Sequence, residues 1–564
     1  MVMRERLRHI KNFIFECRKL LRPVRQSKER NKILVFLAVA MLFNLLNVYM
    51  TVRLNIWSKN FFNALENKDA IEFINQLGIL FLLAGVSLFL FANQKYLCSK
   101  SVLVWRSYMS DYYTHRWLSS KCYYSEIFIK RIDNPDQRIA EDLRIFPTLS
   151  VTLLFDFVDS VSSLGAFAII LWNLSEGYTI FGVVIPGSML WIATSFVFFG
   201  TYIVHKIGSP LIALDRKTQE YEADYRYNLL RLRECAKEIS MYDGQEVEKK
   251  GIVNSFAHVF NIWLKAIRKK RQLSYFNFGY GQISGVVPYL MAAPKYFDGL
   301  FKMGEMMQTV SAFNGVRVSL SWFILNYGRL SEWKAAADRL IQYDLLLDEE
   351  AFTSSFQITE YEKELVLKDV AIKLPDGKLL TNSMNLTVAV GEKVVLTGAS
   401  GAGKSTLFHV LRGLWPFGEG KINMPATDKL FFSQKPYLPL GNLYKVLAYP
   451  KDADILDREI FIKALKSVEL EHLCNCAEVE QNWEKVLSPG EQQRISLGRI
   501  WVHNPQWVFL DEALSSVDNK QRERLLQRLN REYPDLSVLG IEHYGAESSF
   551  YDRRVVWNEW IKAI

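Results

Sequence analysis

The sequence predicts two domains: an all-α domain with six membrane-spanning helices, followed by an α/β domain. A length of 564 residues already suggests more than one domain. Long apolar runs with few or no charged residues recur between residues 33 and 328. From about residue 355 onward, short strand-like apolar runs alternate with helical patterns, as in a parallel sheet flanked by helices.

Six apolar runs in the first domain have the length that a helix needs to cross a bilayer, roughly 20 residues. Backbone polar groups in lipid must be hydrogen-bonded within the segment, so each run is expected to be helical. The six predicted spans are Ile33–Val52, Phe73–Gln94, Leu149–Asn173, Tyr178–His205, Ser274–Pro294 and Met306–Tyr327.

The basic N-terminal arm indicates how the chain is oriented. Residues 1–32 hold eleven Lys or Arg against three Glu, which accounts for most of the net charge of +9. A basic arm can bind nucleic acid, but an apolar run follows it at once, so we expect contact with membrane lipid and no nucleic-acid partner. The long connections 95–148 and 206–273 are also basic, and the positive-inside rule then places both termini in the cytoplasm.

These patterns predict three regions: a basic cytoplasmic arm over 1–32, the transmembrane domain over 33–350 and the α/β domain over 351–564. The six cysteines show no CxxC pair, so we interpret them as reduced thiols rather than as a zinc site or a disulfide framework. The first apolar run is too long and too late for a secretory signal peptide.

A phosphate-binding loop (P-loop) of the form GxxxxGK[ST] opens the predicted nucleotide site. It follows the strand-like Lys393–Leu396 and leads into a helical stretch, which is the context that the motif requires. Backbone N–H groups of such a loop surround phosphates at a helix N-terminus, so we expect ATP as ligand. The loop residues are Gly398, Ala399, Ser400, Gly401, Ala402, Gly403, Lys404, Ser405 and Thr406. Lys404 is expected to neutralise the β- and γ-phosphates, and Ser405 to ligate Mg²⁺.

A second apolar strand ends in two acidic residues. Trp507–Leu510 leads directly into Asp511 and Glu512. Asp511 is predicted to hold the Mg²⁺ hydration shell, and Glu512 to act as general base on the attacking water. This pair is common by chance, so its interpretation depends on the P-loop before it and on the segment between them.

That segment is Leu487–Arg494, which reads LSPGEQQR. Taken alone, it predicts a helix N-terminus in which Ser488 is the N-cap and Glu491 completes a capping box. With the P-loop and the acidic strand end, it resembles the LSGGQ signature of ABC ATPases, which are P-loop NTPases. The resemblance implies that Ser488 and the Gly490 N–H bind the nucleotide of a partner subunit, although Pro489 lacks an N–H.

Three lesser segments occur in the order found in that family. Gln434 resembles the Q-loop glutamine, which reaches Mg²⁺, and Ser515–Asp518 resembles the D-loop. His543 follows a strand-like run and resembles the switch histidine that contacts the γ-phosphate. The family usually stacks adenine on an aromatic residue, whereas the corresponding position here is Leu374.

The resemblance also extends through the transmembrane domain. Asn134–Ile139 (NPDQRI) and Gly413–Pro416 (GLWP) are similar to segments of the SbmA/BacA-like, YddA-like and peroxisomal-type (D-subfamily) ABC transporters. Tyr225–Gly244 is similar to the second cytoplasmic region of that group. The resemblance implies a homodimer in a membrane, here expected to be the bacterial inner membrane, with two shared ATP sites.

The expected function is ATP-driven transport of an unknown solute. Relatives move antimicrobial peptides, cobalamin-like solutes or fatty acyl-CoA, and we expect uptake of a large hydrophilic solute. Export, lipid transport and a non-transporting membrane ATPase are the alternatives. Asp156 and Asp159 share a helix face, and Arg317 lies in another span. Either these charges are structural, as an ion pair or as residues near the bilayer edge, or they are part of a solute cavity.

Overall fold

The computed structural model describes residues 18–119, 124, 135–176, 179–180, 183–348, 355–399, 401–542 and 548–560. The chain divides into two compact units. The first comprises Met1–Ser119 and Ile132–Glu349, and the second comprises Ser120–Arg131 and Glu350–Ile564.

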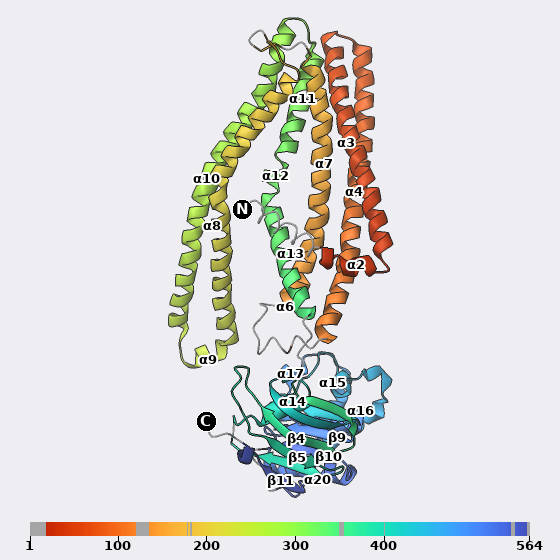
Figure 1. Cartoon of the computed structure of the whole chain (residues 1–564), viewed down its shortest axis with the longest axis vertical. Helices are drawn as coiled ribbons and strands as arrows, with labels where there is room; N and C mark the ends of the chain where they lie inside the picture. Colours follow the sequence, from red (N-terminus) through yellow and green to blue (C-terminus); the bar gives the residue numbers. More distant parts are fainter. Residues whose placement is uncertain are drawn as a thin grey trace. The chain divides into compact units, whose positions relative to one another are not determined.

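The first unit is helical (Figure 1). Its long helices are α3 (Arg30–Glu66), α4 (Ala70–Ser119), α7 (Leu143–Leu174), α8 (Ser188–Glu234), α10 (Gln245–Phe297) and α11 (Met303–Leu320). Its shorter elements are α2 (Arg22–Gln26), α6 (Pro135–Gln137), the π-helical turn η1 (Arg138–Asp142), β1 (Thr179–Ile180), β2 (Val183–Val184), α9 (Ala236–Met241), α12 (Trp322–Leu325) and α13 (Tyr327–Asp348). With 53 residues, α10 is about 80 Å long, so it extends well beyond a hydrocarbon core of about 30 Å.

Four helices in the described part of the chain are long and apolar enough to cross a membrane. They are Arg30–Glu66, Ala70–Ser119, Pro135–Leu174 and Ser188–Glu234. The other two predicted spans, 274–294 and 306–327, lie in α10 and in the region of α11 and α12. The long connection 206–273 between predicted spans is itself helical, since α8, α9 and α10 occupy most of it.

Two predicted spans have the wrong limits. The run 178–205 is helical only from Ser188, because Gly187 has a left-handed backbone (φ 69°) and β1 and β2 pair before it. The run 306–327 is not one helix, since α11 ends at Leu320 and short breaks precede and follow α12. At these breaks Ser321 and Asn326 donate side-chain hydrogen bonds to the carbonyls four residues earlier, which bends helices.

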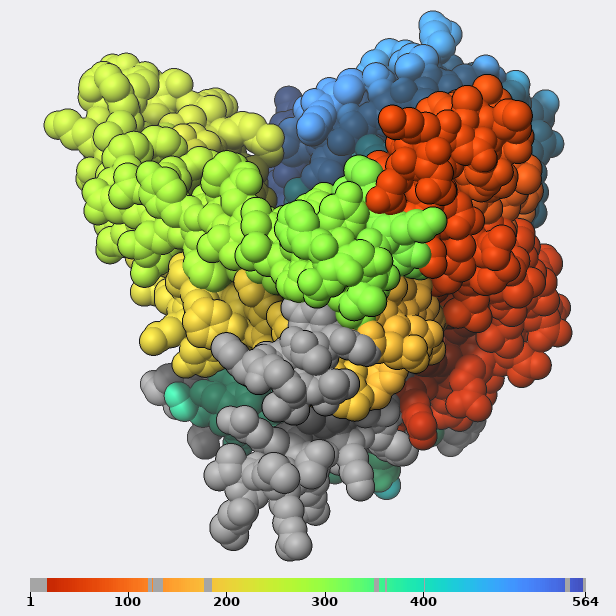
Figure 2. All heavy atoms as spheres, turned by 90° about the horizontal axis from the view of Figure 1, so that it is seen from above, coloured from red at the N-terminus to blue at the C-terminus, as the bar shows by residue number. Residues whose placement is uncertain are grey.

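The long helices of the first unit pack in pairs. Helix α3 packs against α4, and α8 packs against α10. Helix α11 contacts α3, α7, α8 and α10, so it joins the two pairs. Figure 1 shows α8 with α10 on one side of α12 and α13 and α3 with α4 on the other, and Figure 2 shows the same order from above. The apolar side chains of Phe81 and Leu82 are 75% and 67% exposed, as expected for residues that face lipid.

Ion pairs fasten α13 to α4 and to η1, the turn that leads into α7. The carboxylate of Asp142, in η1, is almost fully buried and accepts hydrogen bonds from Arg138 (3.1 Å) and from Arg339 Nε (2.9 Å). Asp344 accepts hydrogen bonds from Tyr113 (3.1 Å) and Arg116 (2.7 Å) of α4. A buried carboxylate is stable only when it is paired in this way, so α13 is held to both neighbours.

The second unit contains two sheets. A five-stranded parallel sheet has the order β11-β6-β10-β9-β8, and a four-stranded sheet has the order β3-β7-β4-β5. The strands are β3 (Gln357–Glu362), β4 (Leu365–Ile372), β5 (Met384–Val388), β6 (Lys393–Thr397), β7 (Gly418–Pro425), β8 (Lys429–Phe432), β9 (Trp507–Asp511), β10 (Ser537–Ile541) and β11 (Arg553–Val556). The helices and 3₁₀ turns are α14 (Lys404–Leu411), α15 (Leu443–Ala448), η2 (Ala453–Ile455), α16 (Arg458–Ser467), η3 (Glu471–Cys476), α17 (Trp483–Val486), α18 (Pro489–Leu497), α19 (Arg499–His503), α20 (Asn519–Glu532) and η4 (Trp557–Trp560).

The parallel sheet aligns the carboxyl ends of its strands. Strands β6, β9 and β10 are buried along their whole length, which explains their continuous apolar sequence. Beneath the P-loop helix, Phe431 stacks on Phe509 at 4.2 Å and Phe408 packs edge-on against Phe509. Because parallel strands end on one edge, the loops after β6, β8 and β9 meet there.

Candidate active site

The P-loop lies between β6 and α14, as the sequence predicted. Gly401 and Gly403 adopt left-handed backbone conformations (φ 74° and 87°). A side chain at Gly403 would be strained by this backbone conformation, and its Cβ would lie 2.6 Å from the Leu380 side chain, which would have to move. Thr406 donates its N–H to the Gly403 carbonyl at the start of α14. Ser400 lies outside the described residues.

Lys404 is buried beneath this loop, with 4% of its surface exposed. Its Nζ donates hydrogen bonds to the carbonyls of Gly398 (2.8 Å) and Ala399 (2.7 Å). Burial lowers the pKa of Lys404, while the nearby Glu512 and Asp511 carboxylates oppose this shift. The ammonium group is therefore held at the loop by bonds that phosphate oxygens can replace.

Ser405 and Asp511 bring two oxygen ligands together. Ser405 Oγ donates a 2.9 Å hydrogen bond to Asp511 Oδ1. Burial raises the pKa of Asp511, and the Ser405 bond opposes that rise. A hydroxyl beside a carboxylate fits Mg²⁺, which takes one or two protein oxygens and completes its shell with phosphate oxygens and water.

Gln434 and Glu512 also meet, from the ends of neighbouring strands β8 and β9. Gln434 Nε2 donates a 2.9 Å hydrogen bond to Glu512 Oε2. Glu512 has a left-handed backbone (φ 47°), which is uncommon for a residue with a long side chain. The structure thus joins the predicted general base to the predicted Q-loop glutamine.

The signature segment begins helix α18. Ser488 is its N-cap, and the predicted capping box with Glu491 is present. Ser488 also donates its hydroxyl hydrogen to Glu491 Oε2 at 2.7 Å. A Cβ on Gly490 would lie 2.9 Å from the Ser516 carbonyl, so the first turn of α18 packs directly against the D-loop backbone. His543 lies outside the described residues, and its role stays a prediction.

A tryptophan that sequence reasoning missed supports the P-loop from below. Trp557 is fully buried, and its indole Nε1 donates a 2.7 Å hydrogen bond to the Ala402 carbonyl. The Trp557 side chain also packs so closely against Gly398 that a Cβ on this glycine would lie 2.9 Å from the Trp557 Cβ. No local motif marks Trp557, because it is separated from the loop by 155 residues.

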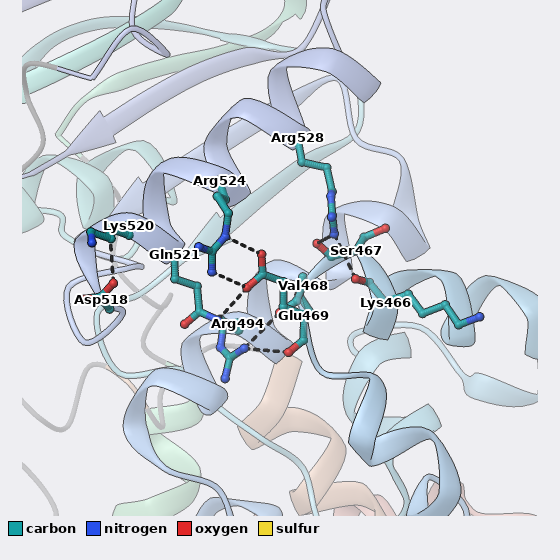
Figure 3. A network of polar contacts seen from close by, with 10 residues as sticks. All are labelled: Lys466, Ser467, Val468, Glu469, Arg494, Asp518, Lys520, Gln521, Arg524 and Arg528. Carbon is teal, nitrogen blue, oxygen red and sulfur yellow. Dashed lines mark hydrogen bonds and ion pairs between the residues drawn. The ribbon is translucent and has the colours of Figure 1, made fainter.

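A second unpredicted feature fastens the signature helix to α20. Figure 3 shows Arg524 paired with the Glu469 carboxylate (3.0 and 3.1 Å) and Gln521 donating to it (2.8 Å). Arg494 of α18 donates to the Glu469 carbonyl at 2.8 Å, and Arg528 of α20 donates to two carbonyls at the end of α16. The Arg524 bond lowers the pKa of Glu469. The turn at Glu469 therefore links α16, α18 and α20.

Of the charged residues predicted inside the membrane spans, Asp156 and Arg317 have different partners among the described residues. Asp156 accepts a 3.1 Å hydrogen bond from Arg329 of α13. Arg317 Nε instead faces Asn314 Oδ1 at 3.4 Å, on its own helix. The structural interpretation is therefore supported for Asp156 through Arg329, whereas Asp159 keeps both of the predicted interpretations.

Comparison with known proteins decides the family. Residues 20–297 match the family described as ABC transporter transmembrane region 2, and residues 381–515 match the family described as ABC transporter. The inner membrane ABC transporter ATP-binding protein YddA of Escherichia coli K12 is 30% identical over 534 residues, which are 93% of this chain and 94% of YddA. The chain belongs to the ABC transporter family.

Two further comparisons concern the subfamily and the fold of this ABC transporter. ABC transporter D family member 2, chloroplastic, of Arabidopsis thaliana is 26% identical over 95% of this chain and 85% of that protein. The predicted resemblance to the YddA-like and D-subfamily group is thus confirmed. A bacterial Atm1-family ABC exporter, solved with ATP bound, has the same fold, with a TM-score of 0.73 at 15% identity and 94% coverage of both chains. The predicted fold class is confirmed as well.

Proposed function

We propose that this ABC transporter is a half-molecule that works as a homodimer and uses ATP hydrolysis to move a large hydrophilic solute, inward, across a bacterial inner membrane. The observation that carries the proposal is the fusion of apolar helices to a domain in which Lys404, Ser405–Asp511 and Gln434–Glu512 meet at one sheet edge. Such a site hydrolyses ATP, and the helices are the part that a solute can cross.

The chemistry follows from the positions of these residues. Bound MgATP supplies the phosphoryl group that is transferred to water, and the metal neutralises its charge. Lys404 binds the phosphates, and Ser405 and Asp511 hold the metal side of the site. Glu512 accepts the proton of the attacking water, while Gln434 orients its carboxylate through the 2.9 Å hydrogen bond. His543 is proposed to contact the γ-phosphate.

Transport in sealed vesicles tests this function. Purified wild-type protein is reconstituted, and uptake of a labelled cationic peptide, cobalamin and a fatty acyl-CoA is measured, with ATP on either side of the membrane. We expect ATP-dependent movement of the peptide or cobalamin toward the side that carries the ATPase domains. Movement in the other direction would show export, and movement of acyl-CoA alone would favour a lipid transporter.

A matched control separates transport from leakage. The Glu512→Gln protein, reconstituted at the same density, should bind ATP but move no solute. If wild-type vesicles hydrolyse ATP but move none of the three solutes, the proposal loses its transport step and a non-transporting membrane ATPase is favoured.

The homodimer makes a separate prediction, because each chain carries one Lys404 and one Ser488. A heterodimer of Lys404→Ala and Ser488→Arg chains keeps one intact composite site, in which the second chain supplies Lys404 and the first supplies Ser488. We expect ATP-dependent closure in this heterodimer but in neither mutant homodimer. Closure is measured by cross-linking between cysteines placed on either side of the Ser488 interface.

The control for this experiment is a heterodimer in which one chain carries both substitutions and the other is wild type. It has the same two lesions, but each of its two sites then lacks one partner, so it should close no better than the mutant homodimers. Full ATPase activity per chain in verified monomers would contradict the composite site.

A further inference from the structure

The side chain of Gln493 joins three parts of the active site. It lies in the signature helix α18 and is 4% exposed. Its Nε2 donates hydrogen bonds to the Gln434 carbonyl (3.0 Å) and to Ser515 Oγ (3.1 Å), and its Oε1 accepts one from the Ser516 N–H (2.7 Å). Both ends of this amide are therefore bonded, and its partners belong to the Q-loop and the D-loop.

The packing around Gln493 leaves little freedom for these segments to move apart. Gly490, one turn earlier on α18, approaches the Ser516 carbonyl so closely that a Cβ would lie 2.9 Å from it. The first turn of α18 and the D-loop therefore touch through both backbone and side chain. A buried amide in such a contact costs free energy if it loses its partners, so its position is well determined.

The adjacent residues Gln492 and Arg494 donate their side-chain hydrogen bonds to other parts of the domain. Gln492 donates to the carbonyls of Glu484 (2.7 Å) and Leu487 (2.9 Å), which lie just before helix α18. Arg494 donates to the Glu469 carbonyl, in the network of Figure 3. Among these three consecutive residues, Gln493 is thus the one whose described side-chain bonds reach the Q-loop.

We propose that Gln493 is a positioning residue for ATP hydrolysis: it ties the signature helix and the D-loop to Gln434, and Gln434 in turn places the Glu512 carboxylate. The path runs from the Ser516 N–H through the Gln493 amide to the Gln434 backbone, and then from the Gln434 side chain to Glu512 at 2.9 Å. This inference rests on the proposed role of Glu512 as general base.

The consequence is that the position of the Glu512 carboxylate depends on the position of the signature helix α18. In the proposed dimer, α18 meets the nucleotide that the partner subunit holds. Engagement of Ser488 by that nucleotide would shift α18, and Gln493 would carry the shift to Gln434. Each chain's base would then sense whether the partner's P-loop, which that chain's Ser488 covers, holds a nucleotide.

The test is steady-state ATPase kinetics of the full-length protein in lipid. Gln493→Leu should lower kcat by about 10- to 100-fold, because small displacements of catalytic groups have effects of this size, while KM for ATP changes by less than about two-fold. The matched control is Gln527→Leu, at an exposed position of α20 that takes no part in the contacts described above. It should keep the wild-type kcat.

A double-mutant cycle with Gln434→Ala tests the path itself. If Gln493 acts through Gln434, the double variant should be about as slow as the slower single variant, because the second change removes an effect already lost. Gln493→Glu serves if the leucine variant does not fold, since it keeps the size and the acceptor but loses both donor bonds. It should also lower kcat.

Three results would overturn the inference: a wild-type kcat in Gln493→Leu or Gln493→Glu, fully multiplicative losses in the cycle, or an equal loss in Gln527→Leu. Glu512→Gln in the same assay keeps this inference separate from the proposed function. A slow Glu512→Gln with a normal Gln493→Leu defeats the positioning role alone, whereas a normal Glu512→Gln defeats the assignment of the base.

Discussion

Replacing Glu512 with glutamine should slow ATP hydrolysis by about 10²–10⁴-fold, the usual effect of removing one positioned base. The amide keeps the shape of the carboxylate and can still accept a hydrogen bond from Gln434, which is 2.9 Å away in the native site. It cannot take a proton from water. ATP binding should therefore be retained, because Lys404 and the P-loop are unchanged.

Single-turnover hydrolysis and equilibrium binding of a fluorescent ATP analogue measure these two expectations separately. Glu532→Gln is the matched control, since Glu532 lies in the same unit and accepts a 2.7 Å hydrogen bond from Trp501. It should hydrolyse ATP at the wild-type rate. An unaltered rate in Glu512→Gln would mean that another residue is the base.

The substitution Lys404→Ala should reduce hydrolysis to background, a loss of about 10³-fold or more, because the site loses the buried cation that is expected to neutralise the β- and γ-phosphates. The change also removes the two hydrogen bonds from Nζ to the Gly398 and Ala399 carbonyls. The loop should therefore lose part of its shape as well as its charge, and ATP affinity should fall.

Purified protein in lipid is suitable for this measurement, with thermal unfolding followed in parallel. Lys378→Ala, at an exposed turn of the same unit, should leave both hydrolysis and unfolding unchanged. Near-normal turnover by Lys404→Ala would contradict the assignment of the nucleotide site.

The nucleotide site was largely predictable because its chemistry fixes the local sequence. A P-loop needs glycines, a lysine and a hydroxyl at set spacing, and parallel strands bring their carboxyl ends together. These rules sufficed to expect Ser405 beside Asp511, and the structure brings them within 2.9 Å. The roles of these residues in catalysis stay predictions.

The contacts that support the site were not predictable in the same way. Trp557 reaches Ala402 across 155 residues, and Gln493 bonds to Gln434 across 59. Each depends on the packing of distant elements, which no local pattern encodes. The roles that we expected for the signature residues came from the resemblance to ABC ATPases, whereas the proposed role of Gln493 comes from its neighbours in the fold.

In the transmembrane domain, hydropathy located helices better than it located their ends. The predicted span 178–205 included the pair β1–β2 and the left-handed Gly187, since apolar residues continue through this turn. The break of 306–327 at Ser321 and Asn326 was missed because both residues are compatible with a helix. Their side-chain bonds to backbone carbonyls decide the geometry there.

The support of the P-loop by Trp557 has a consequence for the order of biosynthesis. The ribosome makes the loop first and its supporting tryptophan 155 residues later, a delay of about 8–30 s at about 5–20 residues per second. During that interval β6 lacks its neighbour β11, and for most of it β10 has not been made either, so the strand before the loop is unpaired. High-affinity ATP binding by a nascent chain would therefore begin only after Trp557 has emerged. Such binding would indicate that synthesis of the domain has passed residue 557.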